Sequence, residues 1–223
     1  MNSRRIVISD IHGCALTFRR LLHEVIDFRR DDRLFLLGDT IDRGPSSKEV
    51  IDYIVSLQED GFQVRPLRGN HEDMFLRSCS DKNFFNLWML NGGRATLENF
   101  GVEDSRCVPN TYRQLIAEWP FFIALPDYIL VHGGLNFTAA DPFADQEAML
   151  WSRDEFVDTA RIGGRKLIGG HTPVGIDDVR RSLVTDRIML DNGCVYKGMP
   201  GLGRLVALDL DSMALHVQEN IDM

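Results

Sequence analysis

Short apolar runs alternate with longer segments of helical periodicity over the first seventy residues. Apolar runs at 5–9, 33–37 and 63–67 have the length and the aliphatic content of buried strands. The segments between them carry apolar residues at three- and four-residue intervals, which is the period of a helix with one buried face. The order strand, helix, strand, helix, strand predicts an α/β fold with parallel strands joined by right-handed crossovers.

Two helices are expected in these intervals. The first covers 16–28, and the second begins near Ser46 or Ser47, either of which is a suitable N-cap. Their expected apolar faces consist of Leu16, Leu21, Leu22, Val25 and Ile26 in the first helix and Val50, Ile51, Ile54, Val55 and Leu57 in the second.

The following segment, about 73–119, loses the strand-like runs. Apolar positions follow helical spacing over 84–90, 94–100 and 112–119, and Asn91-Gly92-Gly93 ends the first of these stretches. We expect a small helical insertion here. Its aromatic residues at 84–88 are expected to fill the core of the insertion rather than to form a substrate platform.

The remainder of the chain is rich in short apolar runs. Strands are expected at 121–125, 128–131, 166–168, 179–184, 188–190, 202–210 and 215–217. No internal repeat, low-complexity tract or linker divides the sequence. We therefore expect a single domain, residues 1–223, that carries the helical insertion.

Composition restricts the class of protein. Of the 223 residues, 44% are hydrophobic and 26% are charged, as in ordinary globular domains. The net charge of -8 argues against nucleic acid as a partner, because binding to the phosphate backbone needs a basic surface. No apolar stretch approaches about 18 residues, and the four cysteines form no CxxC pair. These features predict a cytoplasmic protein with reduced thiols and no membrane partner.

The polar loops that follow the apolar runs carry carboxylate, imidazole and amide groups next to glycine. Because ligands of α/β sheets bind beyond the carboxyl ends of the strands, these side chains are expected to converge. The candidate metal ligands are Asp10, His12, Asp39, Asn70, His132 and His171. Outside these loops, His23 is expected on a helix surface and His216 on a terminal strand.

The candidate donor set offers oxygen and imidazole and no thiolate. It suits Mn²⁺, Fe, Zn²⁺ or Ni²⁺ better than a soft metal. Asp39 is the simplest bridge between two ions. Two ions about 3.5–4 Å apart polarise a phosphoryl group and activate a bridging water as the nucleophile.

Four further residues supply the other parts that phosphate ester hydrolysis needs. Arg43 and Arg153 carry guanidinium groups that match phosphate oxygens. His71 can protonate the leaving oxygen, and Asp42 is a suitable partner to orient His71 and stabilise its charge. The Asp191-Asn192-Gly193 segment is read as a turn that could also line the cleft.

Several motifs, in this order, resemble the signature set of the PPP-type metallophosphatases, and most of all the phage and bacterial serine/threonine protein phosphatases. They are Asp10-x-His12-Gly13, Gly38-Asp39-x-x-Asp42-Arg43-Gly44, Gly69-Asn70-His71-Glu72, Trp88-x-x-Asn91-Gly92-Gly93, His132-Gly133-Gly134, Trp151-Ser152-Arg153 and Gly170-His171. The resemblance implies a calcineurin-like fold: a central β-sandwich flanked by helices, not the single doubly wound sheet that alternation alone suggests.

The resemblance also implies which residue does what. One metal would be held by Asp10, His12 and Asp39, and the other by Asp39, Asn70, His132 and His171. Members of this branch usually work with Mn²⁺. The aromatic substrate loop near the C-terminus of the larger eukaryotic enzymes is not recognisable here, so their regulatory partners are not carried over.

The expected activity is dephosphorylation of phosphoserine and phosphothreonine, and also of phosphotyrosine, in phosphorylated proteins or peptides. The nearest alternative is symmetrical diadenosine tetraphosphate hydrolysis, by a related family with the same metal cradle. That family typically lacks an acid at Asp42 and has Asp at Glu72, so these two residues favour the protein phosphatase. A noncatalytic metal-binding module is a weaker alternative, because every site position is filled.

Overall fold

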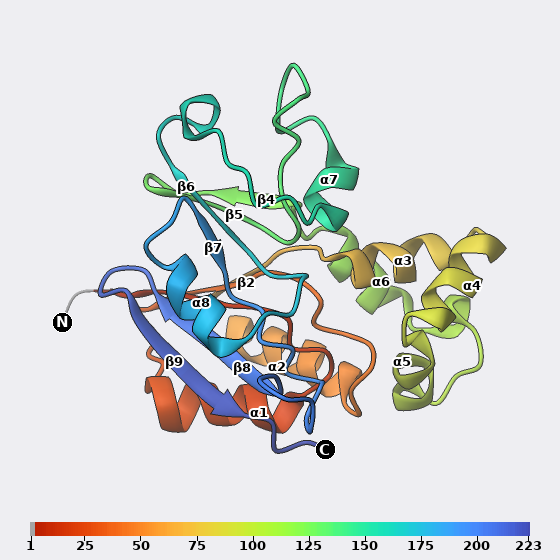
Figure 1. Ribbon diagram of the computed structural model, residues 1–223. Helices are drawn as coiled ribbons and strands as arrows, with labels where there is room; N and C mark the ends of the chain where they lie inside the picture. Colours follow the sequence, from red (N-terminus) through yellow and green to blue (C-terminus); the bar gives the residue numbers. More distant parts are fainter. Residues whose placement is uncertain (1–2) are drawn as a thin grey trace.

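The computed structural model describes residues 3–223 and shows two β-sheets packed face to face (Figure 1). One sheet has five strands in the order β3-β2-β1-β8-β9, and the other has four in the order β4-β5-β6-β7. β1, β2 and β3 are parallel to one another, as are β5, β6 and β7. The sandwich implied by the family resemblance is therefore confirmed.

The elements have the following bounds. The strands are β1 Arg5–Ile8, β2 Arg33–Leu36, β3 Gln63–Pro66, β4 Phe122–Ala124, β5 Tyr128–Val131, β6 Lys166–Gly169, β7 Arg187–Met189, β8 Arg204–Asp209 and β9 Ala214–Glu219. The α-helices are α1 Ala15–Arg20, α2 Ser47–Glu59, α3 Asn70–Ser78, α4 Lys82–Leu90, α5 Gly93–Phe100, α6 Asn110–Ala117, α7 Gln146–Trp151 and α8 Ile176–Ser182. α1 continues as a π-helix over Leu21–Ile26, and short 3₁₀ helices cover Ser105–Cys107 and Thr159–Ile162.

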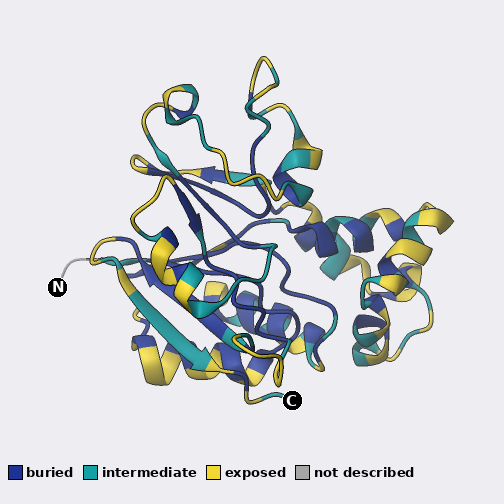
Figure 2. Ribbon diagram, in the orientation of Figure 1, coloured by how far each residue is buried: buried dark blue, intermediate teal, exposed yellow. Residues whose placement is uncertain are grey.

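Strand alternation divides the core into layers. In β1, Ile6 and Ile8 pack with the residues of α1 and α2, whereas Val7 points between the two sheets. In β5, Leu130 also faces the space between the sheets, and Ile129 packs on the outer side beneath α7. The central strands of both sheets are thus buried on both faces, whereas the edge strand β9 is half-buried or exposed, as the colours of Figure 2 show.

The topology brings six loops to one edge of the sandwich. β1, β2 and β3 end at this edge in one sheet, and β5, β6 and β7 end there in the other. Hydrogen bonds join loops within the first group, with the amide of His12 donating to the carbonyl of Asp39 at 2.9 Å. The amide of Gly170 donates to the carbonyl of His132, also at 2.9 Å, in the second group. The two groups of loops form the candidate site.

α3 to α6 form a projection beside this edge, which we call the helical lobe, residues 70–117 (Figure 1). The segment at about 73–119, where the sequence predicts a helical insertion, covers most of this lobe. Trp88 is fully buried in the core that joins the lobe to the sandwich, and the outer turns of the lobe are exposed (Figure 2). The expectation that aromatic residues fill this core holds most clearly for Trp88.

The strand expected at 179–184 is wrong, because this segment lies in and just after α8. Val179 and Leu183 are four residues apart and both face the core between the sheets. Asp177 and Asp178 occupy the first turn of α8, and Arg180 and Arg181 occupy the last, which suits the helix dipole.

The expected apolar face of the first helix is also partly wrong. Leu16 is 57% exposed and Val25 is 37% exposed, whereas Phe18 is fully buried. The change to π-helical winding at Leu21 shifts the later residues around the axis, so an α-helical period does not describe the whole segment. His23 is exposed on this helix and His216 lies on β9, both as expected.

No helix within residues 3–223 is both long enough and apolar enough to span a bilayer.

Candidate functional site

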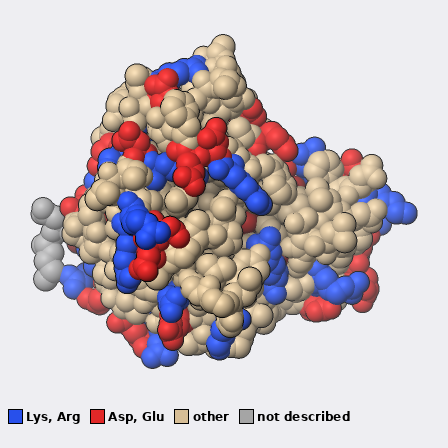
Figure 3. Space-filling model, viewed as in Figure 1, with Lys and Arg blue, Asp and Glu red and all other residues tan. Residues whose placement is uncertain are grey.

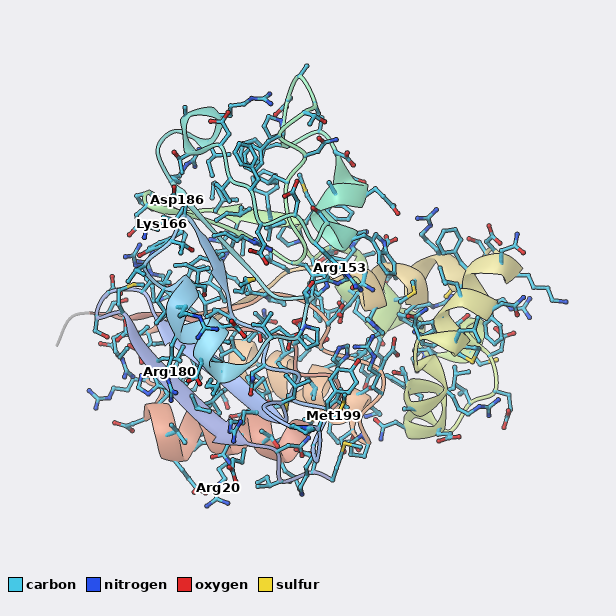
Figure 4. All side chains as sticks on the ribbon, viewed as in Figure 1. Arg20, Arg153, Lys166, Arg180, Asp186 and Met199 are labelled. Carbon is cyan, nitrogen blue, oxygen red and sulfur yellow. The ribbon has the colours of Figure 1, made fainter. Side chains whose placement is uncertain are left out.

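The predicted site residues converge on the edge where the six strands end. Asp10 and His12 follow β1, Asp39, Asp42 and Arg43 follow β2, Asn70 and His71 open α3 after β3, His132 follows β5, and His171 follows β6. The six candidate metal ligands and the Asp42–His71 pair are largely or fully buried. Figure 4 places Arg153 between the sandwich and the lobe.

Asp39 lies at the centre of the cluster. Its Oδ2 atom is 3.6 Å from Nε2 of His12, 3.4 Å from Nε2 of His132 and 3.8 Å from Nε2 of His71. Two groups of potential ligands share this side chain, namely His12, Asp39 and His71 on one side and Asp39, His132 and His171 on the other. A carboxylate in this position can bridge two cations.

Backbone carbonyls orient two of the imidazoles. Nδ1 of His12 donates to the carbonyl of Ile41 at 2.9 Å, and Nδ1 of His132 donates to that of Leu37 at 2.9 Å. The second hydrogen bond also connects the loops of the two sheets. Because neutral imidazole carries one proton, both Nε2 atoms present lone pairs to the site, as metal-binding histidines do.

The amide of Asn70 faces these lone pairs. Its Oδ1 lies 2.8 Å from Nε2 of His132 and 3.0 Å from Nδ1 of His171. An amide oxygen and an unprotonated nitrogen are both acceptors, so a cation is the species that would satisfy this pair. The Nε2 atoms of His71 and His171 are also buried and have no hydrogen-bond partner within residues 3–223.

The buried carboxylates of Asp10 and Asp39 would also be stabilised by a cation. Burial raises the pKa of Asp10 well above its usual range, and the nearby charges of Asp191 and Asp39 raise it further. Burial and the charge of Glu72 likewise raise the pKa of Asp39 well above its usual range. Buried carboxylates that repel one another are stabilised by divalent cations. The donor set, the lone pairs and the charges therefore fit a dinuclear metal centre.

Glu72 holds the backbone of the central ligand in place. Its carboxylate accepts from the amides of Asp39, Thr40 and Gly69 at 2.7–2.9 Å and from the hydroxyl of Thr40 at 2.8 Å. It is fully buried, so its four donors replace water completely. This one side chain ties the loop after β2 to the first turn of α3.

His71 and Asp42 form the predicted pair. Nδ1 of His71 is 2.7 Å from Oδ2 of Asp42, and both side chains are fully buried. Asp42 also accepts from Nε1 of Trp88 and from the hydroxyl of Thr96, each at 2.6 Å. Burial raises the pKa of Asp42 to about 7, although these two hydrogen bonds lower it. The remaining nitrogen of His71 faces the metal cluster.

Guanidinium groups surround the same cluster. Nη1 of Arg43 lies 2.5 Å from Nε2 of His12. Burial lowers the pKa of His171 to about 4, and the charges of Arg153, Arg43 and Arg187 act in the same direction. A histidine that senses three arginines lies in a positive field, which favours a phosphate dianion.

Residues 3–196 match the family model described as "Calcineurin-like phosphoesterase". The chain belongs to this family. With the buried donor clusters, this makes the protein a metal-dependent phosphoesterase.

Proteins named for different phosphoesterase activities are similar to this chain. "Serine/threonine-protein phosphatase 1" of Salmonella typhimurium is 27% identical over 213 residues, covering 89% of this chain and 90% of that protein. An asymmetrical bis(5'-nucleosyl)-tetraphosphatase, PrpE of Bacillus velezensis, is 26% identical over 214 residues, covering 85% of this chain and 84% of that protein. A crystal structure whose description names a diadenosine tetraphosphatase superposes with a TM-score of 0.69 at 21% identity, covering 100% of this chain and 96% of that one. The last likeness concerns the fold alone.

Sequence reasoning missed Arg187 of this calcineurin-like phosphoesterase. Arg187 begins β7, is 8% exposed, and donates through Nη2 to the carbonyl of Gly133, next to His132. Its Nη1 has no partner among the described residues. No motif marks this residue, because an arginine at the start of a strand usually faces solvent.

Within the 191–193 segment, Asp191 lies near the candidate ligand Asp10, and the amide of Gly193 donates to the Asp191 carboxylate at 2.7 Å. Asp191 follows β7 and is 3% exposed, and its charge is the strongest electrostatic influence that raises the pKa of Asp10. The rule that polar residues after buried strands converge would have selected Asp191 as well.

The site also concentrates strained backbone. Positive φ angles at non-glycine residues are uncommon, and seven occur within residues 3–223. Five of them are site residues: His12 at 45°, Asp39 at 50°, Asp42 at 71°, Arg43 at 68° and His171 at 69°. Such conformations persist only where surrounding contacts hold them, and they cluster at functional sites.

Proposed function

We propose that the protein is a phosphomonoesterase that removes phosphate from phosphoserine and phosphothreonine, and also from phosphotyrosine, in phosphorylated proteins. The observation that carries the proposal is the buried His71–Asp42 pair, joined at 2.7 Å, with Nε2 of His71 free to face the cluster. Serine and threonine are poor leaving groups that need a proton as the ester bond breaks. A nucleoside diphosphate leaves readily as an anion and needs such a donor much less.

In this proposal the metal centre uses the ligands implied by the resemblance. Asp10, His12 and Asp39 would hold one ion, and Asp39, Asn70, His132 and His171 would hold the other. Mn²⁺ is the proposed metal, since oxygen and imidazole donors without thiolate suit it. Two divalent ions bound by these residues would supply Lewis acidity and a nucleophilic water molecule of lowered pKa.

The protein groups then handle the substrate's charge and proton. Arg43 and Arg153 would hold the phosphoryl oxygens. The bond from phosphorus to the ester oxygen breaks as the bond to the water oxygen forms, and the proton on Nε2 of His71 passes to the leaving oxygen. Burial lowers the pKa of His71 well below its usual range, but a bound phosphate dianion and ionised Asp42 both favour the protonated form.

The second candidate is hydrolysis of a dinucleoside tetraphosphate, which the name of the similar Bacillus velezensis protein supports. Surface cavities of about 550 and 470 Å³ share Arg43 in their walls, so there is space for a larger substrate next to this arginine. Asp42 and Glu72 favour the phosphatase, since Asp42 is held within a complete proton-donating pair.

The deciding experiment compares two substrates after chelation and re-addition of Mn²⁺. One is a phosphothreonine peptide, and the other is diadenosine tetraphosphate with its nucleotide products separated. Peptide kcat/KM well above that for the tetraphosphate supports the proposal. The reverse, with ADP as the product, establishes the symmetrical hydrolase instead. Asp39→Asn is the control, because turnover that survives loss of the bridging carboxylate does not come from this centre.

A further inference from the structure

Asp42 lies in a closed set of hydrogen-bond donors. Its Oδ2 faces Nδ1 of His71 at 2.7 Å and accepts from Nε1 of Trp88 at 2.6 Å. Its Oδ1 accepts from the hydroxyl of Thr96 at 2.6 Å, and its own amide donates to the Thr96 oxygen at 3.1 Å. Asp42 and Trp88 are 0% exposed and Thr96 is 1% exposed, so water does not compete for these bonds.

Both additional donors come from the helical lobe. Trp88 belongs to α4 and Thr96 to α5, whereas Asp42 belongs to the loop after β2. The turn between the two helices also touches this loop, since the amide of Arg43 donates to the carbonyl of Gly92 at 3.2 Å. A Cβ atom on Gly93 would lie 2.4 Å from the Trp88 ring, so only glycine lets α5 pack this closely against the tryptophan.

We propose that Trp88 and Thr96 are positioning residues through which the lobe fixes the Asp42 carboxylate, and thereby the proton-donating imidazole of His71. The inference rests on the proposed function, because it assigns these residues to the same proton transfer. A carboxylate with one partner can rotate about its Cβ–Cγ bond. Donors on both oxygens prevent this rotation, so Nδ1 of His71 has one fixed partner and Nε2 keeps one direction.

The test uses Trp88→Phe and Thr96→Val, which remove one donor each and keep most of the buried volume. Each variant is assayed on a phosphothreonine peptide and on 4-nitrophenyl phosphate, whose leaving group needs little protonation. We expect kcat on the peptide to fall about 10-fold or more, the scale of one charge-assisted hydrogen bond. KM and 4-nitrophenyl phosphate turnover should change little. Equal losses on both substrates, or none on the peptide, would overturn the proposal.

Two controls separate positioning from folding. Trp119→Phe makes the same chemical change at another buried tryptophan, one that is not a donor to Asp42, and should leave the leaving-group dependence unchanged. Thr96→Ser keeps the hydroxyl and should restore peptide turnover. Thermal melting and bound metal are measured for every variant, and Thr96→Val alone decides the question if Trp88→Phe does not fold.

A double-mutant cycle shows whether the two residues act through His71. Trp88→Phe should cost nothing further in a His71→Asn background, because residues that act as one unit are not additive. A full additional loss in that background contradicts the proposal. If the wild-type protein cleaves only the tetraphosphate, the proposed function fails. If it cleaves the peptide and Trp88→Phe leaves that turnover unchanged, only the inference about Trp88 fails.

Discussion

At the scale of single residues, the position of Asp39 depends on Glu72, a neighbour that is not itself a candidate metal ligand. Asp39 has a left-handed backbone, with φ at 50°, and the Glu72 carboxylate accepts its amide hydrogen at 2.9 Å. The same carboxylate accepts from Thr40 and Gly69. The position of the shared ligand is therefore set by a buried anion with four donors.

Glu72→Gln should disturb this arrangement although it changes little in volume. The glutamine NH₂ group would face an amide donor, so at least one buried donor loses its acceptor, at a cost of about 1–3 kcal/mol. We expect the unfolding free energy to fall by that amount and metal affinity to fall about 10–100-fold, as for other groups that orient ligands. Urea unfolding and metal titration measure the two effects. Glu59→Gln, at an exposed position, is the control.

His71→Asn tests the proposed proton donor directly. We expect kcat on the phosphothreonine peptide to fall by about 10²–10⁴, the usual contribution of a general acid, with both metal ions retained. Turnover is followed by phosphate release and metal content by elemental analysis. Because His71 lies among the potential ligands around Asp39, loss of one metal ion would instead make it a ligand.

Most of the residues that sequence reasoning located follow a local rule, whereas Trp88 and Thr96, whose contacts with Asp42 it did not foresee, do not. Asp39 and His132 stand directly after buried strands, where their convergence follows from the strand arrangement. Trp88 and Thr96 reach Asp42 from 46 and 54 residues away, through packing of a lobe whose placement no periodicity specifies. Composition and spacing carry no information about such contacts.

At the scale of helices and strands, the sequence predicted those strands that consist of a short continuous run of apolar residues. β1, β2, β3 and β5 were located within about one residue. α8 was mistaken for a strand because a seven-residue helix shows too few periods to separate its apolar spacing from strand alternation. Alternation alone also did not reveal that β5, β6 and β7 belong to a second sheet.

Close packing between elements predicts a sensitive glycine at the start of α3. A Cβ atom on Gly69 would lie 2.2 Å from Oδ1 of Asp39 and 2.4 Å from its backbone nitrogen. Gly69→Ala should therefore separate the loop after β2 from α3, lower the unfolding free energy by about 1–3 kcal/mol and weaken metal binding. Calorimetry with and without Mn²⁺ measures both changes.

Gly175→Ala is the matched control for this substitution. Gly175 precedes α8 with an ordinary negative φ of -61°, and its nearest contact would be the Asp178 carboxylate at 3.3 Å. Its effect should be small and independent of metal. A Gly69→Ala protein as stable as this control would contradict the role given to the close contact.

At the scale of the molecule, the site joins the two sheets. The amide of His171 donates to both oxygens of Asp10 at 3.0 and 2.9 Å, and His132 bonds to the carbonyl of Leu37. Each bond pairs a loop of the four-stranded sheet with a loop of the five-stranded one. Metal bound here would connect the same loops, so metal affinity and global stability should be coupled.

The metal-free protein should lose stability as pH rises from about 6.5 to 8. Burial raises the pKa of Asp42 to about 7 and those of Asp10 and Asp39 well above their usual range. The folded state then holds protons that the unfolded chain has released, so the unfolding free energy falls with rising pH. His12 and His132, with pKa values lowered by burial, act oppositely only below about pH 6.5.

Urea unfolding in chelator at the two ends of this range measures the effect. Mn²⁺ would replace the protons bound to Asp10 and Asp39, so its stabilising effect should be larger at the higher pH. Metal-free stability that rises over this interval, or a Mn²⁺ effect independent of pH, would contradict the assignment of Asp10 and Asp39 to a metal centre.

The left-handed backbone at five site residues has a consequence for any selection toward heat resistance. Each such conformation costs about 1–3 kcal/mol, and glycine would relieve it. Stabilising substitutions should therefore be found readily at His12, Asp39, Asp42, Arg43 and His171, and each would remove a group that the chemistry uses. A lineage that gained thermal tolerance by this route would keep the sandwich and lose turnover. Tolerance with activity intact would have to come from substitutions away from this edge.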